Sequence, residues 1–297
     1  MTGTQKGRAR LLKTIVGLVK VTEKQAQKLG LKPYSQISPL LEKSCLLLSA
    51  NESFQNGEKD VETLTGIKVS HSTLQRLVQR TEYQLPSILQ GVSEVCIDGG
   101  KVRLRSQEVG GESYWRDYKV VRLQGIYYGA FFQDNLCLTD WVNSQRLLHP
   151  LICLGDGHDG VWNLFQEIGN TRQRQEILDW YHLKENLYKV GGSLKRLKAA
   201  ETFLWKGRID KAIALLTQLT KKPAQNFINY LKKHSMRLVN YQYCSSYSLC
   251  SIGSGAVESA VKQIGTRLKI SGAQWQEENI PQMLQLRCAY LNGQLTA

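Results

Sequence analysis

An apolar segment that ends in an aspartate between two glycines places the tightest constraint on this chain. Residues 151–156, LICLGD, have the character of a buried strand, and the segment GVWNLFQEIG that begins at Gly160 is helical in character. Asp156 therefore stands at the tip of a core strand. A carboxylate is costly to bury there unless a cation meets it or a helix N-terminus needs it as a cap. We therefore expect a metal ion, a basic side chain or a helix cap beside Asp156.

Two further acids occupy comparable positions beside glycine. Asp98 closes VCID before two glycines, and Glu258 lies in the first turn of the helix that follows the segment GSG. Taken singly, each acid has an ordinary structural explanation as a helix cap, a holder of a glycine turn or a favourable charge at a helix N-terminus. Three converging carboxylates, however, would repel one another unless a divalent cation neutralised them. The set Asp98, Asp156 and Glu258 therefore predicts a site for two Mg²⁺ ions, or Mn²⁺ in their place.

The order of strand and helix signals predicts an α/β fold interrupted by a helical segment. Residues 92–105 and 114–132 are β-branched and partly alternating, which is typical of an antiparallel meander, whereas residues 151–156 and 175–180 each run straight into a helix. In a sheet whose first and fourth strands are neighbours, the first two aspartates would lie side by side. The expected parts are a basic N-terminal arm at 1–40, a helical region at 41–90, the first part of the α/β core at 91–188, a helical insertion at 189–250, and the second part of the core with a C-terminal helix at 251–297.

Residues 54–80 predict two helices joined at a glycine. Ser72 and Gln75 have the spacing of a capping box at the start of the second helix. The leucines of that helix would then face inward and leave Arg76 and Arg80 exposed, as in the recognition helix of a helix-turn-helix. A plain helical hairpin explains the same pattern equally well.

The charge balance favours a polyanionic partner. The chain has 297 residues with 39 Lys and Arg against 25 Asp and Glu, which gives a net charge of +14 and an isoelectric point near 9.4. Nucleic acid is the leading candidate, and a basic protein without such a partner is the plainer alternative. A membrane partner is not expected, because we find no basic amphipathic helix, lipidation signal or apolar window of about 20 residues. We also find no signal peptide, so a cytoplasmic protein is expected.

The cysteines predict neither a disulfide framework nor a zinc site. There are seven, they are scattered, and none is spaced Cys-x-x-Cys. Reduced and mostly buried thiols are therefore expected.

Four segments of the sequence, taken together, resemble a known family. They are IDGGKVRLR, LGDGHDGVWNLF, ILDWYHLKENL and IGSGAVESAVKQIGTRLKISGAQW, within about residues 35–290. In this order they resemble the RNase H-like DDE transposases, and among these the ISKra-type insertion-sequence family, which is related to the Mutator-like elements. The resemblance implies an RNase H-like core in which Asp98, Asp156 and Glu258 are the metal-binding triad. Asp179 and His182 match the Asp-x-x-His motif that the wider group carries before the glutamate.

The resemblance also implies a function and its partners. The expected activity is Mg²⁺-dependent DNA strand cleavage and strand transfer at insertion-sequence ends, by a homo-oligomer that binds terminal inverted repeats and target DNA and is associated with the nucleoid. A structure-selective nuclease of the same superfamily and a catalytically inactive DNA-binding regulator are the alternatives. Members of the family usually carry a longer N-terminal region with paired cysteines, which residues 1–40 lack, so an N-terminally truncated copy is expected.

The segment LDWYH supports two interpretations. In the first, Asp179 ends a strand and caps the following helix, and His182 is an ordinary histidine on its first turn. In the second, which we favour slightly, His182 donates a hydrogen bond to a phosphate while Asp179 orients its ring and favours its protonated form.

One aromatic residue and three cations near the C-terminus are predicted to contact DNA. Trp275 follows the basic residues Lys262, Arg267 and Lys269, and an indole can stack on a base. A core position is nevertheless the more common fate of a tryptophan.

Overall fold

The computed structural model describes residues 9–108, 110–253 and 255–295. The chain divides into two compact units. Unit 1 comprises Met1–Gln84, Arg103–Tyr114 and Thr266–Ala297, and unit 2 comprises Leu85–Val102 and Trp115–Gly265.

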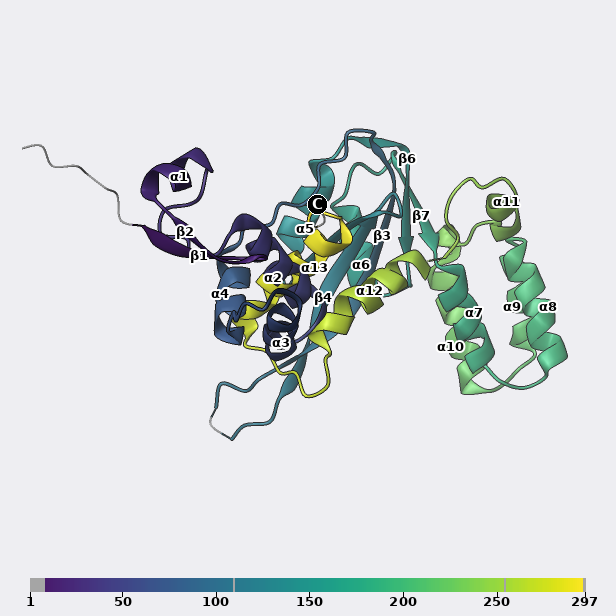
Figure 1. Cartoon of the computed structure of the whole chain (residues 1–297). Helices are drawn as coiled ribbons and strands as arrows, with labels where there is room; N and C mark the ends of the chain where they lie inside the picture. The colour runs from purple at the N-terminus through teal and green to yellow at the C-terminus, as the bar shows by residue number, and fades with distance from the viewer. Residues whose placement is uncertain (1–8, 109, 254, 296–297) are drawn as a thin grey trace, which may run out of the picture. The chain divides into compact units, whose positions relative to one another are not determined.

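A mixed five-stranded sheet in the order β5-β4-β3-β6-β7 is the centre of unit 2 (Figure 1). β6 pairs in parallel with both β3 and β7, whereas β4 and β5 form an antiparallel pair. The first and fourth strands of the sheet in chain order are thus neighbours, the arrangement in which Asp98 and Asp156 would lie side by side. The strands are β3 Val92–Leu104, β4 Tyr114–Leu123, β5 Tyr127–Phe132, β6 Leu147–Gly155 and β7 Arg174–Leu178.

The parallel part of the sheet is buried, as its sequence predicts. Every residue from Leu151 to Gly155 is buried, which is typical of a parallel strand covered on both faces. The helix after β6 packs closely on it, because Gly155 has no side chain to hold off Trp162 and Phe165. The helices next to the sheet are α5 Asn135–Asn143, α6 Asp159–Gln166 and α12 Gly255–Leu268. The sequence had not indicated α5.

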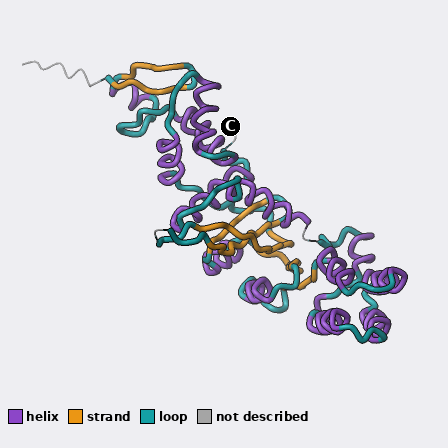
Figure 2. Tube along the Cα trace, turned by 90° about the horizontal axis from the view of Figure 1, so that it is seen from below, coloured by secondary structure: helices purple, strands orange, loops and turns teal. Residues whose placement is uncertain are grey.

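Between β7 and α12 the described chain is helical, and α8 to α11 lie in the segment 189–250 that was expected to be a helical insertion, whereas α7 precedes it. These helices gather beyond β7 at one end of unit 2 (Figures 1 and 2). The rings of Trp180, Trp205 and Tyr241 meet in its core, with Trp180 4.8 and 5.0 Å from the other two centroids. The Tyr241 hydroxyl donates to the Leu178 carbonyl at 2.8 Å, which ties the insertion to β7. The elements are α7 Trp180–Lys189, α8 Leu194–Trp205, α9 Ile209–Thr217, α10 Lys222–Lys233, η1 Ser235–Arg237 and α11 Tyr241–Ser246.

Unit 1 is mainly helical. Its helices α2, α3, α4 and α13 contact one another, and the inward positions Leu74, Leu77 and Val78 of α4 are buried as predicted. The elements are β1 Arg10–Thr14, β2 Gly17–Val21, α1 Glu23–Lys28, α2 Pro39–Asn51, α3 Phe54–Thr65, α4 His71–Arg80, η2 Glu277–Asn279 and α13 Ile280–Leu291.

The described residues of the expected N-terminal arm form an antiparallel hairpin, β1–β2, and the short helix α1. One detail of the predicted helical region is wrong. α4 begins at His71 with Ser70 as its N-cap in an extended conformation, so the capping box predicted at Ser72 and Gln75 does not form. Gly66 does end α3 in a left-handed conformation, as the turn signal predicted.

Two buried arginines close the C-terminal end of α2. Arg267 donates from Nε to the Ser49 carbonyl at 2.8 Å, and Arg287 donates from Nη1 to the Ala50 carbonyl at 2.8 Å. These carbonyls are among the last of the helix and have no partner within it. Cations there also complement the helix dipole. Burial and the neighbouring Arg287 lower the pKa of Arg267 to about 10, which leaves it charged at neutral pH.

All seven cysteines are free and five of them are buried, as expected. None of the described helices combines the length and the apolar composition needed to cross a lipid bilayer.

Gly100 allows the Tyr118 ring to lie across β3 and reach α12. A Cβ at Gly100 would overlap that ring, and the Tyr118 hydroxyl donates to the Val261 carbonyl of α12 at 3.5 Å. A Cβ at the neighbouring Gly99 would have the Lys119 ammonium as its nearest neighbour, at 3.4 Å.

We therefore expect Gly100→Ala to lower the free energy of unfolding by about 1–3 kcal/mol in urea denaturation, as overpacking does. Gly99→Ala is the matched control and should change it by less than about 0.5 kcal/mol. Equal effects of the two substitutions would contradict the packing described.

His234 is a buried histidine that stays neutral. Only 1% of it is exposed, and its ring packs against Trp162 and Tyr230. Burial first, and then the charges of Arg237 and Lys233, lower its pKa from 6.5 to about 4.

This shift predicts a loss of stability in mild acid. The folded pKa lies below the unfolded one, so the contribution is fully present above pH 6.5 and is lost as the pH falls through 4. The loss should be about 1–3 kcal/mol, since each pKa unit corresponds to 1.36 kcal/mol. His234→Gln should flatten the dependence of unfolding free energy on pH between 6.5 and 4, and His149→Gln, at an exposed position, should not. An unchanged slope in His234→Gln would show that other groups control acid unfolding.

Candidate functional site

The parallel pairing of β3 with β6 brings the first two predicted acids to the same level of the sheet. Cys96 pairs with Leu154, and two residues further along each strand stand Asp98 and Asp156. Because residues two apart on a strand point to the same face, both carboxylates leave their strands on one side. Asp98 is not at a strand end, however, since β3 continues to Leu104. Asp98 lies in the middle of β3, level with the end of β6. The register of the β3–β6 pairing therefore places it beside Asp156.

Asp179 continues the same row on the next strand. Gly155 pairs with Leu178, so one residue further Asp156 faces Asp179. The Asp179 N–H donates to the Gly155 carbonyl at 2.8 Å, so the backbone hydrogen bonds between β6 and β7 extend as far as Asp179. The parallel strands β3, β6 and β7 thus present three aspartates in register at one level of the sheet.

Asp179 also begins the helix that carries His182. Its carboxylate accepts from the His182 backbone N–H at 2.7 Å and is the N-cap of α7, as one of the two interpretations of LDWYH predicted. The side chain of Asp179 is completely buried. The same carboxylate lies 3.4 Å from His182 Nδ1. Asp179 therefore both caps the helix and contacts the imidazole.

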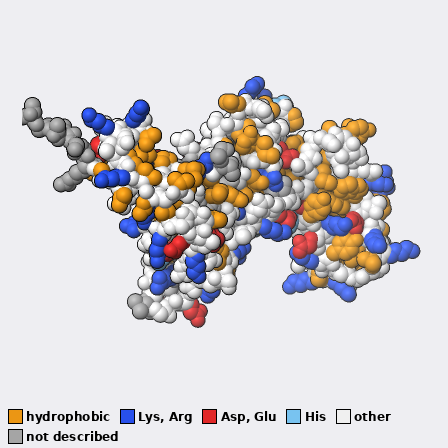
Figure 3. Space-filling view, viewed as in Figure 1, with side chains coloured by type: hydrophobic (Ala, Val, Ile, Leu, Met, Phe, Trp, Pro, Cys, Tyr) orange, Lys and Arg blue, Asp and Glu red, His pale blue; other side chains and the backbone are white. Residues whose placement is uncertain are grey.

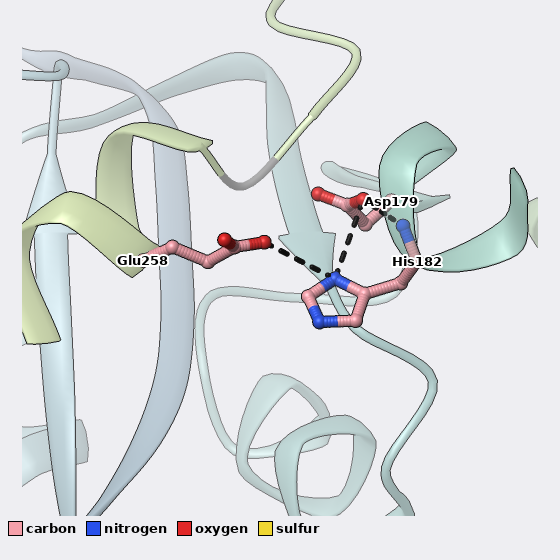
Figure 4. Close-up of side chains that lie close together, drawn as sticks. All are labelled: Asp179, His182 and Glu258. Atoms are coloured by element: carbon pink, nitrogen blue, oxygen red, sulfur yellow. Dashed lines mark hydrogen bonds and ion pairs between the residues drawn. The ribbon is translucent and has the colours of Figure 1, made fainter. Parts of the chain in front are cut away.

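Glu258 reaches the same imidazole from the opposite side. Its carboxylate projects from the first turn of α12 and lies 3.5 Å from His182 Nδ1 (Figure 4). His182 and Glu258 keep 27% and 32% of their side chains exposed, so the group is open to solvent on one side. One ligand atom from each of Asp179, His182 and Glu258 lies within 4.8 Å of the others.

That group differs from the one predicted. Within the described part of the chain, Asp98, Asp156 and Glu258 do not come together as closely, and the pair of residues from LDWYH takes their place beside Glu258. The physical reason is the imidazole, which offers Glu258 a cation at contact distance. Asp98 and Asp156 instead turn to nearby backbone, accepting from the Gly99 N–H at 2.6 Å and from the His158 N–H at 2.9 Å.

The charges of the acids and of His182 nevertheless act on one another. The pKa of Asp98 is raised, first by burial and also by the negative charges of Asp156 and Glu258, while its bond from Gly99 and the charge of His182 lower it. Asp98 therefore feels the charges of Asp156, Glu258 and His182 as well as its own burial.

His182 is the main local counter-charge. Its hydrogen bond with Asp179 is the largest cause that raises its pKa to about 9, with further contributions from the charges of Asp179, Glu258 and Asp156, while burial acts in the opposite direction. It therefore carries a positive charge at neutral pH. Its charge interacts with those of Asp98, Asp156, Asp179 and Glu258.

The helical insertion adds a residue that the sequence had not indicated. Tyr230 of α10 lies against Gly157, where a Cβ would overlap it, and its hydroxyl donates to the Asp156 carbonyl at 3.4 Å. Gly157 has φ of +96°, which favours glycine. Tyr230 is 74 residues away in the chain, so no local pattern could have predicted the contact. Asp156 itself does not cap α6, since His158 is the N-cap.

The basic residues predicted to contact DNA differ in their exposure to solvent. Arg76, Arg80, Lys262 and Lys269 have exposed side chains, and Arg80 also pairs with Glu42 at 3.3 Å. Arg267 is only 3% exposed and serves the end of α2, which argues against its predicted contact with DNA.

Trp275 is part of the fold of unit 1. Its backbone pairs with that of Arg103 and Arg105, and its indole N–H donates to the Leu268 carbonyl at 2.9 Å. Its ring contacts the Arg267 guanidinium with 5.0 Å between guanidinium carbon and ring centroid. Trp275 is half-buried, and most of its ring packs inside unit 1, as is common for tryptophan.

Comparison of the sequence with models of known protein families and with curated proteins found no match.

The double role of Asp179 predicts a difference between two substitutions. Asp179→Ala removes a buried helix cap and should lower the free energy of unfolding by about 1–2 kcal/mol, whereas Asp179→Asn keeps a capping side chain and should recover most of that loss. Chemical denaturation of the two variants measures the difference. Asp134→Ala, which removes the cap of α5, is the matched control and should cost about the same without affecting His182. If Asp179→Ala were as stable as the unsubstituted protein, the capping role would be excluded.

Proposed function

We propose that this chain is a DDE transposase of RNase H-like fold, similar to the ISKra-type insertion-sequence family, that cleaves and joins DNA strands with Mg²⁺. The observation that supports this most strongly is the row of Asp98, Asp156 and Asp179 on neighbouring parallel strands, with Glu258 brought close by α12. Acids placed this close repel one another and so do not stabilise the fold, whereas a divalent cation would be bound well among them.

The topology of unit 2 agrees with the proposal. Numbered along the chain, the five strands of the sheet lie in the order 3-2-1-4-5, so the first and fourth strands are neighbours, as the proposed core requires. The helical insertion lies between the strand that carries Asp179 and the helix that carries Glu258, where the resemblance places it.

On this proposal the site takes a pair of Mg²⁺ ions. Asp98, Asp156 and Glu258 would hold the metal, and Asp98, whose pKa is raised first by burial and then by the charges of Asp156 and Glu258, is a carboxylate that a bound cation would stabilise in its charged form. Bound there, the ions would activate the attacking hydroxyl or water and stabilise the leaving oxygen of a phosphodiester. Glu258 would exchange its ion pair with His182 for this role.

His182 then has a function that follows from its surroundings. Asp179 holds the imidazole in place and keeps it protonated, so the ring presents a cationic N–H donor beside the acids. A phosphate of the bound DNA is the acceptor that suits such a donor. Asp179 is on this account a positioning residue.

The remaining charges would hold the DNA. The helical insertion, residues 189–250, contains twelve Lys and Arg and only two Asp and Glu, and basic side chains are prominent over its helices in Figure 3. Arg76 and Arg80 of α4, and Lys262 and Lys269 near the C-terminus, are exposed cations that can contact phosphates. The proposed partners are terminal inverted repeats and target DNA, bound by a homo-oligomer.

One observation favours a second candidate, an inactive DNA-binding regulator. Glu258 is paired with His182 and not grouped with Asp98 and Asp156 at ligand distances. A Mg²⁺-dependent nicking assay separates the two candidates, because only the transposase cleaves. Inverted repeats flanking the coding segment would in turn separate a transposase from a structure-selective nuclease.

The metal-binding acids and His182 predict different losses of activity. Asp98→Ala, Asp156→Ala and Glu258→Ala should abolish cleavage of element-end DNA, because each removes a metal ligand. His182→Ala should slow single-turnover cleavage by roughly 10²-fold, the scale of losing one positioned catalytic group. All four variants should bind DNA as tightly as the unsubstituted protein in a gel-shift assay. Near-normal cleavage by Glu258→Ala would remove that residue from the site.

A further inference from the structure

Unit 1 contains a cavity that is lined mainly by carboxamide side chains. The cavity measures about 240 Å³ and lies between α4, the residues after β3 and the segment that leads into α13. Six of its lining side chains are carboxamides: Gln75, Gln79, Gln274, Gln276, Asn279 and Gln282. Arg105 is the one charged residue in this lining, and no acid belongs to it. Its size is below the roughly 300–1,000 Å³ typical of pockets for drug-sized ligands, which limits a ligand to a small group.

The carboxamides are already ordered by bonds among themselves. Gln79 donates from Nε2 to Asn279 Oδ1 at 2.9 Å, and Asn279 donates from Nδ2 to Gln276 Oε1 at 3.3 Å. Gln282 donates to the Val78 carbonyl at 2.9 Å and to the Thr81 carbonyl. These bonds fix one end of each amide and lower the entropic cost of binding.

Several amide groups of the cavity have hydrogen-bonding capacity left. Among the residues that the structure describes, the side chains of Gln75 and Gln274 make no hydrogen bond, and the Oε1 atoms of Gln79 and Gln282 accept none. A carboxamide offers a donor and an acceptor in one plane. A ligand that suits this lining therefore has donors and acceptors side by side and no net charge.

Two aromatic rings form the apolar part of the wall. Phe54 and Trp275 both line the cavity, and both hold the buried guanidinium of Arg267 at 5.0 Å from their ring centroids. The shared cation and the bond from the Trp275 indole to Leu268 keep the rings in place. A planar ligand could stack on such a wall without rearranging it.

We infer that this cavity binds an unpaired nucleobase, adenine in preference to the others. Adenine presents an N6 donor beside an N7 acceptor, the pattern that Gln and Asn side chains pair with in two bonds, and it has a flat face for the aromatic wall. Arg105 would meet the adjoining phosphate. This inference rests on the proposed function, because it takes DNA as the partner. It goes beyond that function in proposing that unit 1 binds a base that has been displaced from the duplex.

The test uses duplex DNA that carries a fluorescein at one end and a single unpaired adenine, and the same duplex fully paired. Binding is measured by fluorescence without Mg²⁺, so that no cleavage is needed. We expect the full chain to bind the unpaired probe about tenfold more tightly, the scale of one stacked base. Gln75→Ala and Gln79→Ala should each reduce that preference severalfold. Gln225→Ala is the matched control, at an exposed position of α10, and should keep it.

The outcomes are separable. Equal affinity for both duplexes, or a preference that survives Gln75→Ala combined with Gln79→Ala in a protein that melts at its normal temperature, overturns the base pocket. A retained preference for the unpaired base in a chain that fails to cleave DNA with Mg²⁺ would support the pocket and count against the proposed transposase. Cleavage without any such preference would do the reverse.

Discussion

The parallel pairing of β6 with both of its neighbours is the constraint on which the candidate site depends. Three aspartates come from segments that are about 58 and 23 residues apart in the chain, and only the register of this pairing sets them in one row. A slip of one residue in either pair would turn one carboxylate to the opposite face of the sheet. The buried apolar residues of β6 fix the register, because a slip would also move them out of the core.

The charge on His182 is the second element of the site. Without a cation, the negative charges of these neighbouring acids would repel one another and weaken the fold. The imidazolium between Asp179 and Glu258 relieves part of that repulsion and leaves Asp98 and Asp156 facing local backbone N–H groups. We propose that Mg²⁺ relieves the remaining repulsion when it binds with the substrate.

Much of unit 2 could be predicted from the sequence, because its signals are local. Alternating and apolar segments gave the strands, and the glycine-flanked acids gave Asp98, Asp156 and Glu258 as candidates. What the sequence could not give depends on contacts between distant segments. Arg267 looks like an exposed cation in a basic segment, yet it is buried because the end of α2, 218 residues away, needs donors. Asp98 looks like the end of a strand because two glycines follow, whereas those glycines continue β3 beneath Tyr118. The pairing of His182 with Glu258 likewise follows from tertiary packing and not from spacing.

Uptake of divalent metal by Asp98, Asp156 and Glu258 is tested most directly by counting bound Mn²⁺ with electron paramagnetic resonance. The unsubstituted protein, bound to DNA, should hold two Mn²⁺ ions that Mg²⁺ displaces, and Asp156→Asn should lose at least one of them while remaining folded. Absence of bound Mn²⁺ in the unsubstituted complex, or full occupancy in Asp156→Asn, would contradict the account.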